Sequence, residues 1–250
     1  MALNHASLSS PVTSNQAGQH ENLKTVVIRH AASHFDKPIA AHTRQAFTDL
    51  HQAVNLATRD IVLDSGCGTA NSSLVLAREF HRHLVLGVDK SLHRLSKAQR
   101  VQAPNLHLLR ADLIDFWRLI HSANLNIERH YIFYPNPWPK SKHLQRRWHG
   151  HPIFPVMLGL SAFLELRTNW KIYADEFTAA IEYLLNEGFI EGNIECTRFR
   201  PNVPISAFEE KYLASGHELY QVIFERKKYD GPLPPTVLQA DKDRSSPGFA

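Results

Sequence analysis

Short apolar runs alternate with longer amphipathic stretches through the middle of the chain, and this pattern predicts alternating strands and helices. Strands are expected at residues 60–66, 84–89, 105–113, 129–135, 194–200 and 217–227, and helices at 71–83, 91–102, 116–124 and 177–188. Residues 154–175 are expected to form one further helix followed by a strand. About seven strands that alternate with helices predict an α/β fold, doubly wound and Rossmann-like, with a mostly parallel sheet between two helical layers.

The two ends of the chain lack this pattern. Residues 1–22 are rich in Ser, Asn, Gln, Ala and His, and residues 229–250 form a polar, Pro-rich stretch. Segments of this composition have little apolar surface to bury. We therefore predict a flexible arm at 1–22, a single domain at 23–228 and a flexible tail at 229–250.

The composition is that of a globular protein with a sizeable core, since 43% of the 250 residues are hydrophobic. No apolar run approaches the roughly 18 residues of a membrane span, and the first residues lack the basic-then-apolar order of a secretory signal. We expect a cytoplasmic protein, a monomer or a weak homodimer. Cys67 and Cys196 are expected to stay reduced.

The charges are more informative in their distribution than in their sum of +4. Five groups that are or can become cationic lie close together without an acid among them: Lys140, Lys142, His143, Arg146 and Arg147. Such a run suits the phosphates of a nucleic acid, although a solvated helix face has the same composition. The 16 histidines scatter without a spacing such as H-E-x-x-H, so no metal site is expected.

A glycine loop, LDSGCGTANSS at residues 63–73, follows the first of the alternating strands and opens a helix. Gly66 and Gly68 stand where the backbone has to turn sharply and approach a ligand closely. About 20 residues later the next strand ends at Asp89, which can accept hydrogen bonds from two ribose hydroxyls. Asp64 and Asp112 stand at the ends of the first and third strands, and Asp112 is placed to meet an adenine amino group.

A dinucleotide cofactor is the competing interpretation of this loop. The spacing G-x-G-x-x-G fails, because Asn71 stands where the third glycine belongs. S-adenosylmethionine fits better, since it has an amino-acid end and no pyrophosphate for a helix N-terminus to hold. The expected cofactor site consists of Asp64, Gly66, Gly68, Asp89, Asp112 and Asn136.

The fourth strand of this series ends on YPNPWP, residues 134–139. Ligands of an open α/β sheet bind beyond the carboxyl ends of its strands, so Asn136 is expected beside the reacting methyl group. Pro135 and Pro137 restrict the backbone. Trp138 offers a face on which a base can stack, and a core or lid position is the alternative for it.

Residues 134–147, YPNPWPKSKHLQRR, resemble the F-P-D-P-W-P-K-K-R-H-H-K-R-R signature of the bacterial tRNA (guanine-N7-)-methyltransferases, the TrmB-like family. Residues 206–226 resemble the family's T-K-F-E-x-x-G-x-x-x-G-H-x-V-x-D-L-x-F-E-R block, and IYADEFTAAIEYLL resembles its T-D-x-x-x-Y-A-x-x-M segment. With the cofactor loops, the resemblance covers roughly residues 58–227. It implies a seven-stranded class I S-adenosylmethionine-dependent fold and methylation of a guanine in the variable loop of tRNA.

The resemblance also implies roles for single residues. Asp64, Asp89 and Asp112 match the family's cofactor contacts, and Asn136 matches its active-site aspartate. Substrate contacts are expected at Lys140, Asp175, Ser206, Ala207, Phe208 and Glu209. RNA contacts are expected at Trp138, Lys142, His143, Arg146 and Arg147.

The chain departs from the family pattern at Ala70, Asn136, Ala174, Ser206 and Ala207, where the family has Gly, Asp, Thr, Thr and Lys. Two alternatives therefore stay open. The first is a methyltransferase of the same fold that acts on an exocyclic amino group, because Asn136-Pro137-Trp138 partly matches an N-P-P-[FYW] turn. The second is a catalytically weak paralogue that binds cofactor or RNA.

Overall fold

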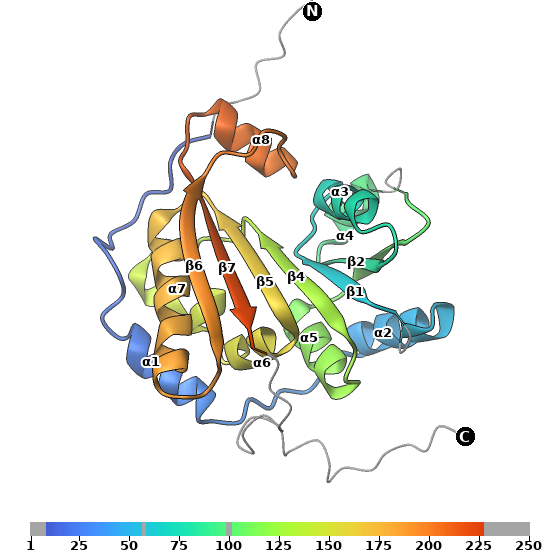
Figure 1. The fold of residues 1–250 in the computed structure, drawn as a ribbon, viewed down its shortest axis with the longest axis horizontal. Helices are drawn as coiled ribbons and strands as arrows, with labels where there is room; N and C mark the ends of the chain where they lie inside the picture. The colour runs from blue at the N-terminus through green and yellow to red at the C-terminus, as the bar shows by residue number, and fades with distance from the viewer. Residues whose placement is uncertain (1–8, 57–58, 99–101, 228–250) are drawn as a thin grey trace, which may run out of the picture.

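The computed structural model describes residues 9–56, 59–98 and 102–227, and these residues build a seven-stranded sheet with helices on both faces (Figure 1). The strands are β1 Ile61–Ser65, β2 Leu84–Asp89, β3 Leu106–Arg110, β4 Ile127–Phe133, β5 Ser161–Thr168, β6 Gly192–Phe199 and β7 Leu219–Arg226. Their spatial order is β3-β2-β1-β4-β5-β7-β6. Neighbours from β3 to β5 pair in parallel, whereas β7 is antiparallel to both β5 and β6.

The helices are α1 Leu23–Ala31, α2 Ala41–Ala53, α3 Asn71–Glu79, α4 Leu92–Lys97, α5 Leu113–Ser122, α6 Phe154–Gly159, α7 Lys171–Asn186 and α8 Ala207–Ala214. Buried apolar residues of α1, α2, α5, α6 and α7 form one large core with one face of the sheet. Those of α3 belong to a smaller cluster on the other face, and the partly buried Leu95 of α4 packs against a third cluster of Cys67, Ala70 and Ala98. The predicted doubly wound α/β fold is therefore confirmed.

The predicted element bounds hold best in the first half of the chain, where β2 covers exactly the predicted residues 84–89. Residues 154–175 contain the predicted helix and strand, α6 and β5, but the strand ends at Thr168 and residues 171–175 already belong to α7. Helix α7 begins at Lys171 rather than at residue 177. Its buried face already includes Tyr173 and Ala174, which continue at helical spacing to Phe177 and beyond.

Residues 9–22 of the predicted arm lie against the domain. They run from the neighbourhood of α8 along the side of α7 to α1 (Figure 1). Hydrogen bonds join them to the segment after β4, to α7 and to the end of α8, for example from Ser14 Oγ to Pro139 O at 2.5 Å. The predicted tail, residues 229–250, lies outside the described residues.

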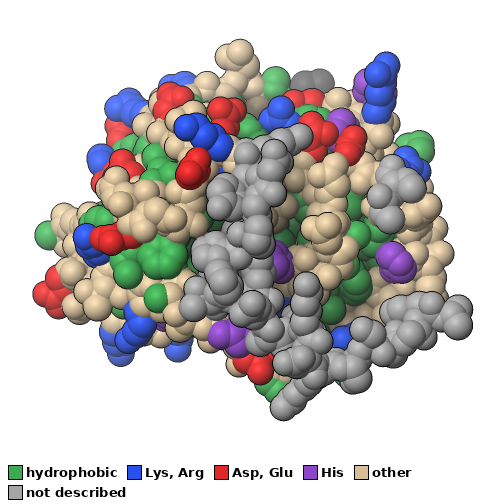
Figure 2. Space-filling view, turned by 60° about the horizontal axis from the view of Figure 1, so that its bottom comes forward, with side chains coloured by type: hydrophobic (Ala, Val, Ile, Leu, Met, Phe, Trp, Pro, Cys, Tyr) green, Lys and Arg blue, Asp and Glu red, His purple; other side chains and the backbone are tan. Residues whose placement is uncertain are grey.

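Within the described ranges, the protein has no helix of the length and apolar character needed to cross a membrane. Cys67 is buried, Cys196 is exposed, and neither is in a disulfide. Figure 2 shows the side that lies toward the bottom of Figure 1, away from α8. Acidic and basic side chains are interspersed on the uncovered part of that side.

Candidate active site

Two cavities lie beyond the carboxyl ends of β1, β2 and β4. The first has a volume of about 470 Å³ and the second of about 670 Å³. Both are lined by Gly66, Arg94, Phe133, Tyr134, Pro135 and Asn136. Because these residues are shared, Asn136 and its neighbours stand at the junction of the two cavities, which is where ligands of an open α/β sheet are expected.

The glycine loop forms one wall of the junction. Gly66 and Gly68 have φ of 85° and 60°, a region that glycine enters without a Cβ penalty. A Cβ added to Gly66 would meet no other atom within 4 Å, so the space in front of this residue is open to a ligand. Ala70 is also left-handed, at φ 63°, which explains why a glycine suits the end of such a loop.

Asp64 lies behind the loop. It is 1% exposed, and its Oδ2 accepts hydrogen bonds from Ser72 Oγ at 2.7 Å and Ser73 Oγ at 2.6 Å. Burial raises its pKa to about 6, although both hydroxyls oppose the shift. Asp64 lines neither cavity, so the structure corrects its predicted place: the carboxylate anchors the start of α3 instead of facing a ligand.

Asp89 and Asp112, the predicted cofactor contacts, both line the first cavity. Asp89 Oδ1 accepts a hydrogen bond from Ser91 N at 2.7 Å, and its Oδ2 accepts one from Gly68 N at 3.0 Å. Arg94 Nη1 lies 3.2 Å from the same Oδ2. The Arg94 side chain is about half exposed (48%), so it can leave Asp89 to a polar ligand. Asp112 caps α5 through Ile114 N at 3.0 Å.

The segment after β4 has two aromatic residues in left-handed backbone conformation, Tyr134 at φ 51° and Trp138 at φ 46°. Such conformations cost about 1–3 kcal/mol each and gather at functional sites. Asn136 between them is exposed, and its Oδ1 accepts a weak hydrogen bond from Trp138 N at 3.3 Å. The amide of Asn136 is therefore free to turn toward either cavity.

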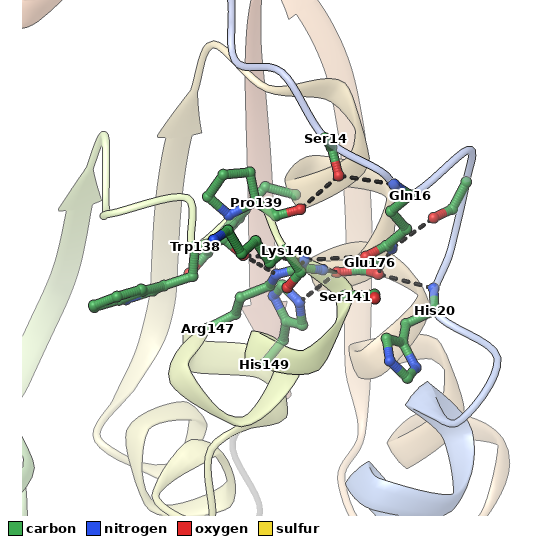
Figure 3. Close-up of polar contacts among 12 residues, drawn as sticks. Ser14, Gln16, His20, Trp138, Pro139, Lys140, Ser141, Arg147, His149 and Glu176 are labelled. Atoms are coloured by element: carbon green, nitrogen blue, oxygen red, sulfur yellow. Dashed lines mark hydrogen bonds and ion pairs between the residues drawn. The ribbon is translucent and has the colours of Figure 1, made fainter.

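The basic run divides into an outer and an inner side. Residues Ser141–Arg146 form a 3-10 helix, in which every third residue shares a side. Lys140, Lys142 and Arg146 are exposed and His143 is half-buried, with Arg146 placed 4.8 Å over the Trp138 ring. Arg147 is fully buried and pairs with Glu176 (Figure 3). The predicted RNA contact at Arg147 is therefore wrong, because its guanidinium does not reach the surface.

Residues 206–209 also differ in their positions. Ser206, Ala207 and Phe208, the predicted substrate contacts, line the second cavity, and Phe208 is 53% exposed. Glu209 is fully buried and lines neither cavity. Its carboxylate accepts hydrogen bonds from Tyr134 Oη at 2.7 Å, Ile205 N at 2.7 Å and Arg167 Nη1 at 3.1 Å. The predicted substrate contact at Glu209 is therefore wrong, because its buried carboxylate instead connects Tyr134, Ile205 and Arg167.

Asp175 lies on the exposed side of α7, where it pairs with Lys171 at 2.7 Å, and it lines neither cavity. The predicted substrate contact there is wrong. Asn169, directly after β5, lines the second cavity instead. The signal was present in the sequence, since Thr168-Asn169 followed by Tyr173-Ala174 matches T-D-x-x-x-Y-A at its proper spacing.

The charged side chains that line the second cavity are positive. Among the described residues that line it, Arg94, Lys97 and Lys211 are cationic, and none is Asp or Glu. Lys140, predicted as a substrate contact, is exposed but is not in the lining of either cavity. Lys211 follows Ala207 by four residues on α8, so both face the same side.

One group of possible metal ligands occurs among the described residues, namely Asp60, His83 and Glu128, with ligand atoms within 4.8 Å of one another. His83 Nε2 and Glu128 Oε2 are 2.6 Å apart. The group belongs to the amino ends of β1, β2 and β4 and to neither cavity, so it has no part in this site.

Comparisons with known proteins agree with this geometry. A family model described as "Putative methyltransferase" matches residues 58–222. A tRNA (guanine-N(7)-)-methyltransferase of Methylobacillus flagellatus is 25% identical over 66% of this chain and 71% of its own length. The protein of the same name from Nitrosospira multiformis is 26% identical over 54% of this chain and 58% of its own length. The resemblance given by residues 134–147 and 206–226 is thereby confirmed.

Among solved structures, a variant of the 16S rRNA (adenine(1408)-N(1))-methyltransferase from Catenulisporales acidiphilia, solved with its cosubstrate SAM, aligns with a TM-score of 0.50. The alignment covers 74% of this chain and 93% of that one, at 16% identity. At this identity the likeness bears on the fold alone, and it agrees with a class I, Rossmann-like sheet.

Proposed function

The chain belongs to the methyltransferase family that its sequence matches, and we propose that it transfers a methyl group to N7 of a guanine in the variable loop of tRNA. S-adenosylmethionine is its cofactor and supplies an electrophilic methyl group on a sulfonium centre. The observation that carries the proposal is the junction at Asn136. There a cavity lined by two carboxylates and three cations meets one whose charged lining residues are all cationic. A donor and an acceptor held on its two sides would meet there.

The first cavity fits S-adenosylmethionine. In the proposal Asp89 accepts hydrogen bonds from the ribose hydroxyls once Arg94 moves aside, and Asp112 lies beside the adenine. The open space at Gly66 lets the cofactor approach the backbone of the loop. Asp64 supports this wall from behind through the two serine hydroxyls at the start of α3.

The described residues that line the second cavity include no Asp, Glu or His to act as a general base, and this suits N7. Burial raises the pKa of the Cys67 thiol and of the Tyr134 phenol, so both stay protonated at neutral pH. The N7 lone pair of guanine lies in the plane of the ring and carries no proton, so its methylation needs alignment rather than deprotonation. Phe208 offers an exposed ring for stacking on the base, and Lys97 and Lys211 offer charge to nearby phosphates.

Incubation with radiolabelled cofactor and unmodified bulk tRNA, followed by nucleoside digestion and chromatography, tests the proposal directly. Label is expected in N7-methylguanosine. Label in another nucleoside would identify a different acceptor. Intact cofactor binding without label in tRNA would exclude the proposed reaction.

The outer side of the basic run is proposed to hold the tRNA backbone. Arg146→Glu should weaken tRNA binding and reduce the slope of log K against log salt by roughly 1, because one phosphate contact is lost. Arg82→Glu makes the same change at an exposed position that lines neither cavity, and it should leave the slope unchanged. Filter binding measures both slopes of log K against log salt. Equal slopes for the two variants would show that Arg146 does not contact the tRNA backbone.

Methylation of an exocyclic amino group is the second candidate, because two amides, Asn136 and Asn169, stand where the family pattern has acids. Methylation of N7 leaves a cationic ring, which an added carboxylate stabilises. Asn136→Asp should therefore preserve kcat/KM or raise it, by up to roughly tenfold. A loss of about 100-fold would favour chemistry that uses the amide itself. Asn193→Asp, an exposed position outside both cavities, is the matched control.

A further inference from the structure

A buried ionic group lies beneath the segment that follows β4. Glu176 of α7, Arg147 and His149 are each at most 1% exposed. Arg147 Nη1 and His149 Nε2 both meet Oε2 of Glu176, the latter at 2.9 Å (Figure 3). Burial favours a neutral His149, but the guanidinium remains charged and keeps Glu176 ionised. Buried charges persist when they are paired, and each member here has a partner.

Arg147 uses its remaining donors to hold the strained backbone above it. Its Nε and Nη2 donate to Trp138 O at 3.2 and 3.1 Å, and Nη2 also reaches Lys140 O at 3.4 Å. Trp138 is the residue with φ 46°, so the guanidinium fixes the carbonyl of a left-handed residue. The conformation of this segment therefore depends on where Arg147 is held.

The N-terminal residues 9–20, here called the strap, hold the same segment from the other side. Ser14 Oγ donates to Pro139 O at 2.5 Å, and Asn15 Oδ1 accepts from Ser141 N at 3.3 Å. These two residues bind the carbonyl and amide that lie on either side of Lys140. Figure 3 shows Ser14 and Gln16 reaching this segment from the strap.

The strap also completes the coordination of the buried group. Gln16 Nε2 donates to Glu176 Oε1, and Gln16 Oε1 accepts from Arg147 Nη2 at 3.0 Å. His20 N donates to the same Oε1 of Glu176 at 2.9 Å. The Gln16 side chain thus bridges both members of the ion pair. Arg147 in turn donates hydrogen bonds to the carbonyl of Trp138.

The beginning of the strap lies at the second cavity. Val12 is part of the cavity lining, next to Asn169 and residues of α8. Ser9 N donates to Ser215 Oγ at 2.8 Å, and Ser9 O accepts from His217 Nε2 at 2.9 Å. His217 Nδ1 lies 3.0 Å from Asn169 Nδ2. No strap residue lines the first cavity.

We propose that the strap and the buried group of Glu176, Arg147 and His149 position the acceptor side of the active site. They hold residues 134–141 in the conformation that places Asn136 at the junction of the cavities. Ser14, Gln16 and Glu176 are positioning residues, because they act through Arg147 and the backbone of this segment. That the acceptor is tRNA rests on the proposed function, whereas the positioning itself does not.

The double variant Ser14→Ala/Gln16→Ala in the full chain removes the hydroxyl and the bridging amide. It should lower kcat/KM for tRNA roughly 10- to 100-fold, since a small misplacement of a catalytic segment costs this much. The dissociation constant for S-adenosylmethionine should rise by a smaller factor than this. Residues 134–138 do contribute to the first cavity, but the strap makes its bonds to Pro139, Ser141, Arg147 and Glu176 rather than to Asp89 or Asp112. Gln19→Ala is the matched control, since the Gln19 amide donates to the Tyr183 hydroxyl of α7, at 2.6 Å, rather than to residues 134–141 or to Glu176. Ser14→Thr retains the hydroxyl and should keep wild-type activity.

Hydrogen exchange measured by mass spectrometry on the peptide 134–147 gives a readout that needs no turnover. Exchange there should be about tenfold faster in the double variant than in wild type or Gln19→Ala, because the bonds that close this segment are lost. Wild-type exchange in the double variant would overturn the proposal, as would unchanged kcat/KM in an active enzyme. A parallel loss of cofactor affinity, with faster exchange throughout the chain, would show general loosening and would also overturn it.

If wild type and Gln19→Ala both fail to methylate tRNA, the proposed function fails. The exchange comparison then decides the positioning role alone. If both are active and only the double variant is impaired, with faster exchange confined to 134–147, the two proposals stand together.

Discussion

Asp89→Ala is expected to weaken S-adenosylmethionine binding by roughly 100- to 10,000-fold and to reduce methyl transfer at limiting cofactor by the same factor. In the proposed site the carboxylate accepts two hydrogen bonds from ribose hydroxyls, and each bond to a charged group contributes about 1.5–3 kcal/mol. The carboxylate also binds the amides of Gly68 and Ser91, which shape the wall of the cavity. The variant therefore loses the contacts to the ribose and also the hydrogen bonds that hold the glycine loop in shape. Titration calorimetry measures the change in affinity.

Two further variants separate these contributions. Asp89→Asn keeps the shape and one acceptor oxygen, so its affinity should fall between those of wild type and Asp89→Ala. Asp49→Ala removes an exposed carboxylate of α2 that lines neither cavity and should bind the cofactor as wild type does. Wild-type affinity in Asp89→Ala would place the ribose elsewhere and would remove the first cavity as the cofactor site.

The features that the sequence predicts well depend on neighbours along the chain. A buried parallel strand needs a short apolar run, and its ligand-binding end needs small or polar residues directly after it. Gly66, Asp89 and Asn136 each follow such a run, so both their sheet edge and their proximity could be predicted. Helix α8 was not among the predicted helices, although its start has a capping pattern, with Ser206 Oγ accepting from Glu209 N at 3.2 Å.

The features that the sequence did not predict depend on partners far away in the chain. Arg147 belongs to a basic run whose composition suits RNA, and only the fold brings Glu176 to it. Glu209 appears polar and exposed in its motif, yet Tyr134, 75 residues away, occupies its carboxylate. The strap lacks apolar periodicity because it is held by polar contacts of Ser14, Gln16 and Ser9 rather than by a buried face. A hydrophobicity pattern does not detect such a segment.

The placement of Asp175 failed for a different reason. The motif T-D-x-x-x-Y-A was matched on its acid at residue 175, although the chain has an amide at the corresponding position, Asn169. The end of β5 fixes the alignment, because the residue after a strand reaches the cavity and one on the outer side of α7 does not. A match of residue type, as at Asp175, is therefore weaker support for a site residue than a match of position. Asn169 has the matching position after β5 although its residue type differs.

Glu176→Gln is expected to give the largest loss of stability, about 3–5 kcal/mol, because it leaves the buried Arg147 guanidinium without a counter-charge. In a chain of this size the loss corresponds to a fall in melting temperature of roughly 6–20 °C. Glu182→Gln, on the exposed side of the same helix, should change the free energy of unfolding by no more than about 0.5 kcal/mol. Denaturant unfolding measures both.

The pH dependence of this loss distinguishes a charge effect from a packing effect. Burial alone would raise the pKa of Glu176, but His149 and Arg147 outweigh it and hold the pKa at about 2, below the ordinary 4.5. A carboxyl whose pKa is lowered on folding contributes stability that is complete above 4.5 and is lost as the pH falls toward 2. The unfolding free energies of wild type and Glu176→Gln should therefore converge in acid. A constant difference from pH 7 to pH 3 would mean that shape, not charge, holds Arg147 beneath the acceptor segment.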